Sequence, residues 1–238
     1  MLRAYLFLLF FIPLTLLTAV VTIISTLFDP TGAWYHRLCR LWSVTGVRFA
    51  GVRVEAEGQE HVPSDTPVIF MSNHQAGFDI LALYIASPQQ FAWIAKDELF
   101  RIPLFGHSMA RAGYIPLDRS HGRRALKSME AAAGRIRGGT SVVIFPEGTR
   151  TTDGNLLPFK SGGFLLASRA GVPIVPVTIN GSHRVNPCTR LALYPGTIRV
   201  VFGPPIATAG MKKKDAELME TVRNAIASNL EVPHDRAA

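Results

Sequence analysis

The fold is decided by residues 66–85, whose sequence is TPVIFMSNHQAGFDILALYI. The run up to Met71 is largely apolar and has the length of a buried strand, and the run from Phe78 onward is typical of a helix. Polar and small residues, Ser72 to Gly77, lie between the two runs. A buried strand followed directly by a helix is the unit from which α/β sheets are built.

The same alternation continues on both sides of this segment. Strands are expected at 52–56, 66–71, 90–95, 141–145, 172–179 and 197–202, and helices at 78–85, 123–136, 163–170 and 216–230. This order predicts an α/β fold with a central, mostly parallel sheet flanked by helices. Proline cannot donate a hydrogen bond to a neighbouring strand, so Pro173 and Pro176 predict that the strand at 172–179 lies at an edge or is irregular.

The amino-terminal segment, residues 4–28, contains no charged side chain. It is longer than the roughly 20 residues that a helix needs to cross a bilayer. A cleaved signal peptide would have an apolar region of only about 7–15 residues and a small-x-small cleavage site. Because residues 25–30 offer no good site of that kind, we expect the segment to be retained.

Two membrane arrangements are compatible with this segment. Pro13 would kink its helix or divide it in two. The following stretch, 33–45, is amphipathic if helical, with Arg37 and Arg40 away from its apolar face. The alternatives are a single span and a pair of helices within one leaflet. Positive residues follow the apolar stretch, which predicts a cytoplasmic body, at the inner membrane if the protein is bacterial. Residues 1–50 form the predicted anchor and residues 51–238 the α/β domain.

The composition fits a membrane surface better than an ordinary cytosolic enzyme. The chain has 238 residues, a formal charge of +8 and 48% hydrophobic residues, but only 18% charged residues against the roughly 25% of soluble domains. These values exclude a disordered chain. The two cysteines, Cys39 and Cys188, indicate neither a disulfide framework nor a zinc site. We expect no metal and no cofactor, because no side chains cluster at metal-ligand spacing.

The first polar junction pairs a histidine with a carboxylate. His74 and Asp79 are five residues apart and can meet only if residues 75–77 form a turn, which Gly77 permits. Asp79 could then hold one ring nitrogen of His74 and leave the other as a base. The alternative makes Asp79 a plain helix cap and His74 a loop residue.

The second junction is FPEGTR, residues 145–150, directly after an apolar run. Arg150 supplies a planar cationic group, and Gly148 lets backbone N–H groups approach a ligand, a combination suited to phosphate. Glu147 would orient Arg150 or bind a substrate hydroxyl. The alternative is an ordinary loop with a Glu–Arg ion pair.

The third junction is AGYIPLDR, residues 112–119, which precedes a basic stretch extending to 137. Arg119 closes a strand-like run and could face a ligand. The basic residues after it have the character of a solvated helix face. We expect no nucleic-acid partner, because no recognition motif accompanies the charge.

Together these junctions resemble the glycerolipid acyltransferase family, in particular the lysophosphatidic acid acyltransferases. NHQAGFD (73–79) resembles its His-x4-Asp motif, GYIPLDR (113–119) its second block, FPEGTR (145–150) its third and VPIVPV (172–177) its fourth. The blocks in this order are far more specific than any one alone. Lys96 and Lys160 also fall where the family carries lysine.

The resemblance implies transfer of a fatty acyl group from a thioester to the sn-2 hydroxyl of 1-acyl-glycerol-3-phosphate, which gives phosphatidic acid. His74 would be the general base and Asp79 would hold its ring. Substrate binding would fall to Glu147, Gly148, Thr149, Arg150, Arg119, Lys96 and Lys160. The implied partners are the bilayer, lysophosphatidic acid, and acyl-CoA or acyl carrier protein as donor.

Two other functions remain open on the sequence. An acyltransferase for a different lysophospholipid or a lyso-aminolipid would keep the chemistry and change the acceptor. A membrane-bound lipid-binding protein without catalysis would belong to another class, and the presence of both His74 and Asp79 counts against it. Acceptors with and without a terminal phosphate monoester separate the two enzyme functions.

Overall fold

The computed structural model describes residues 1–29, 31–117, 123–208 and 216–231. Seven strands form one sheet in the order β1-β7-β6-β2-β5-β3-β4. Their bounds are Val52–Glu57 (β1), Ile69–Ser72 (β2), Ala92–Lys96 (β3), Ile115–Leu117 (β4), Val142–Ile144 (β5), Ile174–Asn180 (β6) and Gly196–Phe202 (β7). Every neighbouring pair is parallel except β6 and β7. The predicted α/β class with a mostly parallel sheet is therefore confirmed.

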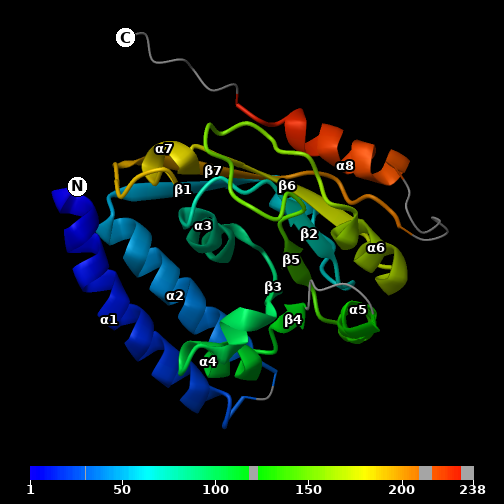
Figure 1. Cartoon of the computed structure of the whole chain (residues 1–238), viewed down its shortest axis with the longest axis horizontal. Helices are drawn as coiled ribbons and strands as arrows, with labels where there is room; N and C mark the ends of the chain where they lie inside the picture. Colours follow the sequence, from blue (N-terminus) through cyan, green and yellow to red (C-terminus); the bar gives the residue numbers. More distant parts are fainter. Residues whose placement is uncertain (30, 118–122, 209–215, 232–238) are drawn as a thin grey trace.

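The helices of the body lie on both faces of this sheet. They are α3 (Phe78–Ala86), α4 (Phe105–Arg111), α5 (Arg123–Arg137), α6 (Ser161–Ala170), α7 (Ser182–Val185) and α8 (Ala216–Ala227), with 3-10 turns at Gln59–His61 and Asp97–Arg101. In Figure 1, α5, α6 and α8 lie on one side of the sheet and α3 on the other. The four longer predicted helices are present within three residues at each end. The short elements α4, β4 and α7 and the two 3-10 turns went unpredicted as elements, because three to seven residues carry too little periodicity.

The expectation for the proline-containing strand is wrong, because β6 lies inside the sheet, between β7 and β2. The carbonyl of Pro176 accepts a hydrogen bond from the Gly203 N–H at 2.8 Å. In an extended strand a residue's nitrogen and oxygen point to the same side, so the missing N–H of Pro176 also faces β7. There β7 has already ended at Phe202. The pairing of β6 with β2 therefore loses no hydrogen-bond donor. Pro173 lies just before β6 begins.

The amino-terminal helices form a hairpin along the body. The helix α1 (Leu2–Ser25) is unbroken and has Pro13 inside it, and α2 (Ala33–Phe49) runs back between α1 and α3 (Figure 1). Pro13 therefore does not divide the segment. At Gly46 a β-carbon would lie 2.5 Å from the Phe11 ring and 2.9 Å from Leu81, so only glycine lets the three helices pack this closely.

Polar contacts tie both ends of α1 to the rest of the chain. Near its start, the Arg3 guanidinium donates to the Ala50 carbonyl at 2.5 Å. Near its end, Thr22 Oγ1 lies 3.1 Å from Ser108 Oγ on α4, and that hydroxyl also lies 3.1 Å from Tyr35 Oη on α2. The helix α1 is thus held against α2 and α4 over its whole length.

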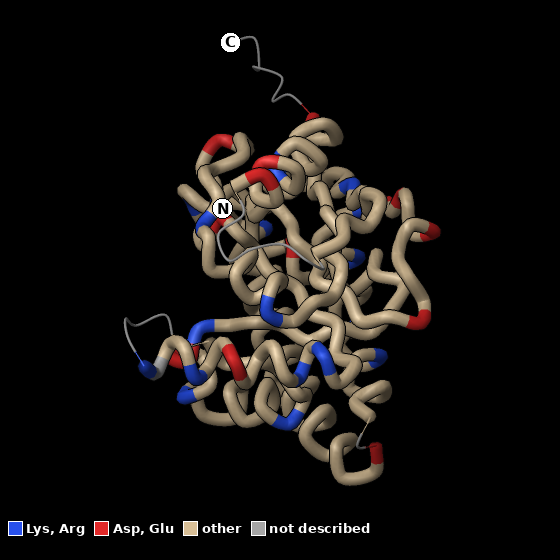
Figure 2. Tube along the Cα trace, turned by 90° about the vertical axis from the view of Figure 1, so that its right-hand side faces the viewer, with Lys and Arg blue, Asp and Glu red and all other residues tan. Residues whose placement is uncertain are grey.

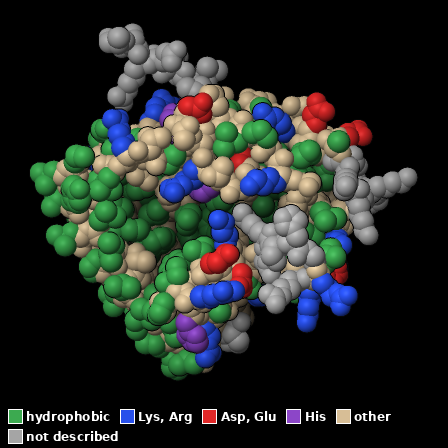
Figure 3. Space-filling view, in the orientation of Figure 1, with side chains coloured by type: hydrophobic (Ala, Val, Ile, Leu, Met, Phe, Trp, Pro, Cys, Tyr) green, Lys and Arg blue, Asp and Glu red, His purple; other side chains and the backbone are tan. Residues whose placement is uncertain are grey.

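The opposite face of α1 is apolar and exposed. Its exposed side chains are Leu2, Tyr5, Leu6, Leu9, Ile12, Leu16, Leu17, Val20, Val21 and Ile24. Hydrophobic side chains gather on this edge of the molecule in Figure 3. Among the residues described, α1 is the one helix with the length and composition to cross a membrane. This exposed surface suggests that the protein associates with a membrane.

Candidate active site

The first two polar junctions meet at one edge of the sheet. His74 follows β2 by two residues, and Phe145 directly follows β5. These strands are parallel neighbours, so their carboxyl ends lie side by side. The Thr151 N–H also donates to the His74 carbonyl at 2.9 Å, which joins the two loops. Ligand sites of open α/β sheets lie at this carboxyl edge.

The side chains of His74 and Asp79 are in contact, as the expected turn requires. His74 Nδ1 lies 2.8 Å from Asp79 Oδ2. The same oxygen accepts the backbone N–H groups of Gln75 at 2.6 Å and Ala76 at 2.9 Å. One carboxylate oxygen therefore holds both the turn and the imidazole. Because a carboxylate can only accept, Nδ1 carries the proton and Nε2 is left with a free lone pair.

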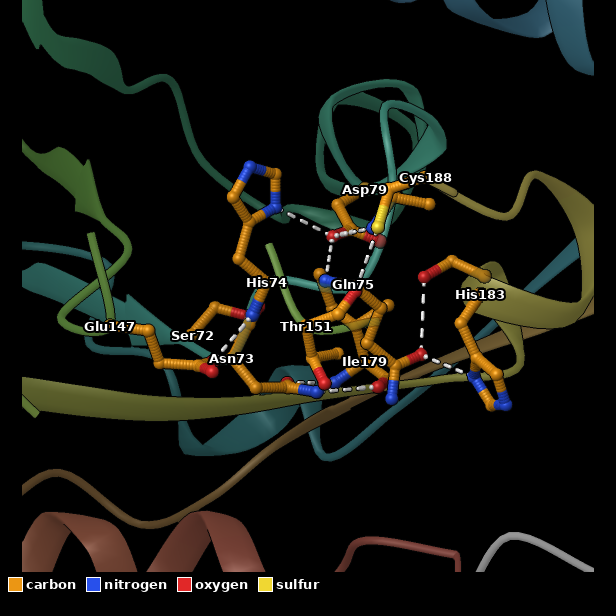
Figure 4. Close-up of polar contacts among 12 residues, drawn as sticks. Ser72, Asn73, His74, Gln75, Asp79, Glu147, Thr151, Ile179, His183 and Cys188 are labelled. Atoms are coloured by element: carbon orange, nitrogen blue, oxygen red, sulfur yellow. Dashed lines mark hydrogen bonds and ion pairs between the residues drawn. The ribbon is translucent and has the colours of Figure 1, made fainter. Parts of the chain in front are cut away.

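The Asp79 carboxylate is fully buried and the His74 imidazole is partly exposed, as a general base with a supporting carboxylate requires. The Asp79 side chain is 0% exposed, whereas the His74 side chain is 17% exposed. Figure 4 shows the far nitrogen of the His74 ring pointing away from Asp79. In the described part of the chain, no residue forms a hydrogen bond to His74 Nε2. The site thus presents an oriented basic nitrogen to the outside.

Glu147 has a different surrounding from the one expected. Its Oε1 accepts the His74 N–H at 2.8 Å and its Oε2 accepts the Leu157 N–H at 2.9 Å. The residue is 2% exposed, and burial raises the pKa of its carboxyl to about 6. Both oxygens are occupied by backbone donors and none of the described contacts joins it to Arg150. Glu147 therefore fastens the two loops together. The sequence could not show this, because the partners are backbone atoms.

The remaining predicted binding residues lie around these loops. Thr149 and Arg150 are exposed, and so are Lys160 and Lys96, the last residue of β3. Gly148 has a φ of 72°, and a β-carbon there would lie 2.9 Å from Lys160 Nζ. The Lys160 ammonium thus rests on the glycine of the FPEGTR loop. Arg119 lies outside the described residues.

The basic stretch that follows Arg119 forms α5, on which Lys and Arg outnumber Asp and Glu (Figure 2). Two of its arginines have structural contacts: Arg135 donates to the Gly113 carbonyl at 2.6 Å, and Arg137 donates to the Arg169 carbonyl at 2.6 Å. Arg123 and Lys127 are exposed, as a solvated helix face requires.

Comparisons with known proteins identify the family of this chain. A family model described as Acyltransferase matches residues 53–180, which is more than half of the chain. The chain belongs to this acyltransferase family. The matched range contains β1 except for its first residue, β2 to β6, the His74–Asp79 pair and the FPEGTR loop.

Several curated acyltransferases are similar in sequence. The chloroplastic 1-acyl-sn-glycerol-3-phosphate acyltransferase BAT2 of Brassica napus is 35% identical over 83% of this chain and 56% of its own length. The alpha enzyme of Mus musculus is 34% identical over 80% and 68%, and that of Pseudomonas aeruginosa is 36% identical over 68% and 62%. The chain spans little more than half the length of the chloroplast relatives.

A solved acyltransferase has the same fold. The crystal structure of the 1-acyl-sn-glycerophosphate (LPA) acyltransferase PlsC from Thermotoga maritima has a TM-score of 0.80. The match covers 95% of this chain and 94% of that one, at 24% sequence identity.

Two residues of the candidate site were not singled out by sequence reasoning, although they lie inside the quoted motif. The Asn73 amide donates to the Ile179 carbonyl at 2.9 Å and accepts the Ile179 N–H at 2.7 Å, which extends the pairing of β2 and β6. Gln75 Nε2 donates to the Gly154 carbonyl at 3.2 Å, and its Oε1 accepts from the hydroxyl of Ser182 (Figure 4). A polar side chain with a fixed backbone partner has no local pattern that would reveal it.

Proposed function

We propose that this acyltransferase moves a fatty acyl group from a thioester to the sn-2 hydroxyl of 1-acyl-glycerol-3-phosphate and forms phosphatidic acid. The observation that carries the proposal is the basic nitrogen of His74, oriented by the buried Asp79 and placed beside loops with exposed cations. The names of the sequence relatives support the choice of acceptor.

The reaction needs a base because an alcohol is a weak nucleophile. His74 Nε2 takes the proton of the hydroxyl as its oxygen attacks the thioester carbonyl. The new C–O ester bond forms, the C–S bond breaks, and the leaving thiolate recovers the proton from the imidazolium. The Asp79 carboxylate stabilises the imidazolium between these two steps. The acyl group passes directly from donor to acceptor.

The phosphate of the acceptor would bind to the cations of this edge. Arg150, Lys160 and Lys96 are exposed and have no ion-pair partner in the described part of the chain. Lys160 immediately precedes α6, whose free N-terminal N–H groups add positive potential. An arginine can bind two phosphate oxygens at once, which makes Arg150 the first candidate. Arg119 remains a proposal on sequence grounds.

Replacing Arg150 with alanine is expected to raise the apparent KM for lysophosphatidic acid by about 10- to 100-fold, because a hydrogen bond to a charged group is lost. The KM for the thioester should change by less than about threefold. Steady-state kinetics with each substrate varied in turn measure the two values. Arg53→Ala is the matched control, because Arg53 is an exposed arginine on β1, at the far edge of the sheet. Equal losses for both substrates would show that Arg150 has a structural role.

The acceptor is tested directly with purified protein in lipid vesicles. Lysophosphatidic acid is compared with lysophospholipids whose phosphate carries a headgroup, and each is supplied with acyl-CoA or with acyl carrier protein as donor. Preference for the phosphate monoester supports the proposal, and preference for a headgroup-bearing acceptor overturns it. The two donor arms determine which thioester is used.

The geometry of α1 favours placement of the hairpin in one leaflet over a single span. Arg3 ties the start of α1 to Ala50 at the end of α2, and Thr22 ties its end to Ser108 on α4, so α1 would have to break these contacts to cross the bilayer alone. Its exposed apolar face would lie among acyl chains, while Arg37 and Arg40 on α2 reach lipid phosphates. Both lipid substrates would then reach the site from the membrane. The cytoplasmic side remains a prediction from the positive residues.

Cysteine labelling distinguishes the two arrangements. A cysteine is placed at Leu2, the first residue of α1, or at Leu27, two residues after its end, with Cys39 and Cys188 replaced by alanine. In sealed vesicles, a membrane-impermeant maleimide is expected to react with both positions from the same side. Reaction of the two positions from opposite sides would establish a span.

A further inference from the structure

The imidazole of His74 lies flat against the ring of Phe145. The ring centroids are 3.9 Å apart and the planes differ by 9°. This is closer and more parallel than the offset or edge-on geometry that most aromatic pairs adopt. The contact brings the ring of the proposed base onto the face of a phenylalanine that directly follows β5, the parallel neighbour of β2.

A second ring supports Phe145. Trp93 on β3 packs on Phe145 with centroids 5.6 Å apart and planes at 27°. Trp93 is itself held, because its Nε1 donates to Tyr84 Oη at 3.0 Å and its ring contacts Phe91 edge-on. The strands β2, β5 and β3 are adjacent in that order; His74 follows β2, Phe145 follows β5, and Trp93 lies on β3. The stack is therefore built into the sheet.

We propose that Phe145 is a positioning residue that fixes the plane of the His74 imidazole and stabilises its protonated form; this inference rests on the proposed function. The Asp79 hydrogen bond fixes the position of one nitrogen but allows the ring to tilt about that bond. A parallel ring at van der Waals distance removes the tilt, so that Nε2 points in one direction. The electron-rich face of Phe145 attracts the positive charge that the imidazole gains when it takes the proton.

Several charged or titratable groups besides the ring face His74 or its turn. Asp79 on α3 contacts Nδ1, and Glu147 in the loop after β5 accepts the backbone N–H. His183 on α7 contacts the turn through Gln75, with its Nδ1 3.2 Å from Gln75 Oε1, and Lys160 lies beyond Gly148. A change at position 145 removes none of these groups, so the difference between variants reports the aromatic face.

The test replaces Phe145 with leucine, which keeps an apolar side chain and removes the aromatic face. The 13C-labelled ring signal of His74 is assigned by its loss in His74→Gln and followed by NMR as the pH is changed. Its titration midpoint is expected to move to lower pH, and kcat to fall about 2- to 30-fold, the range of a cation–π contact. The KM for the acceptor should stay unchanged. Phe159→Leu is the control, because Phe159 stacks on Phe164 and, among the described residues, on no histidine.

A second series protects the result against a folding defect. Phenylalanine analogues with one, two and three fluorine atoms at position 145 keep the ring shape and progressively weaken its negative face. The midpoint is expected to fall in step with fluorination. An unchanged midpoint in both the leucine variant and the fluorinated series would overturn the proposal. Because the midpoint is measured without substrate, a chain that shows the midpoint change but transfers no acyl group would overturn the proposed function and leave the stack standing.

Discussion

Replacing His74 with alanine is expected to lower kcat for acyl transfer by about 10²–10⁴-fold, the range that a positioned general base contributes. No other side chain in the described part of the chain contacts the His74 ring through a hydrogen bond besides Asp79, so no second base is held in its place. The measurement is turnover of lysophosphatidic acid by purified protein in vesicles.

Two further measurements show that the loss is chemical. Binding of the His74→Ala protein to vesicles should match that of the unaltered protein, because the substitution leaves the exposed apolar side chains of α1 unchanged. His107→Ala removes an exposed histidine on α4 and should leave turnover unchanged. Near-normal turnover in His74→Ala would disprove the assignment of the base.

Substitutions of Asp79 are expected to lower kcat strongly as well. Two variants separate the effect of its charge from that of its hydrogen bonds. Oδ2 accepts all three hydrogen bonds, and the buried Oδ1 accepts none. An asparagine can therefore place its carbonyl oxygen where Oδ2 lies and keep the turn, but it lacks the negative charge that stabilises the imidazolium. We expect Asp79→Asn to lower kcat by about 10- to 100-fold with little change in KM.

Asp79→Ala removes the charge and also the acceptor of the turn. It is expected to lower kcat by about 10²–10⁴-fold, close to the loss in His74→Ala. Thermal unfolding should also occur at lower temperature, since the N–H groups of Gln75 and Ala76 lose their partner. Equal kcat values for the Asn and Ala variants would show that the charge of Asp79, and not the hydrogen bonds, accounts for the whole effect.

The parts of the fold that could be predicted are those with local patterns. Residues 66–85 show an apolar run, a polar turn and a helical run, and the structure has β2, the turn and α3 there. The contact of His74 with Asp79 followed from spacing, because only a turn at 75–77 allows it. Both rest on interactions between residues close in the chain.

The predictions that were wrong or missing concern contacts between residues far apart in the chain. The central place of β6 depends on where β7 ends, beside Pro176, and no feature of residues 172–179 contains that information. Glu147 was expected to orient Arg150 or to bind a substrate hydroxyl, but it accepts the N–H groups of His74 and Leu157. The ring of Phe145 contacts His74 because the two residues follow neighbouring strands of the sheet. Sequence spacing cannot reveal contacts that the sheet order creates.

The packing of α1 links the lipid environment to the chemistry. Phe7 on α1 stacks on Phe11 and contacts the ring of Phe78, whose centroid is 5.4 Å away. Phe78 is the residue directly before Asp79. A shift of α1 caused by bilayer thickness or lateral pressure would thus be transmitted through one aromatic contact to the carboxylate that aims the imidazole. On the proposed function, α1 would therefore bear on the orientation of the base as well as on attachment to the bilayer.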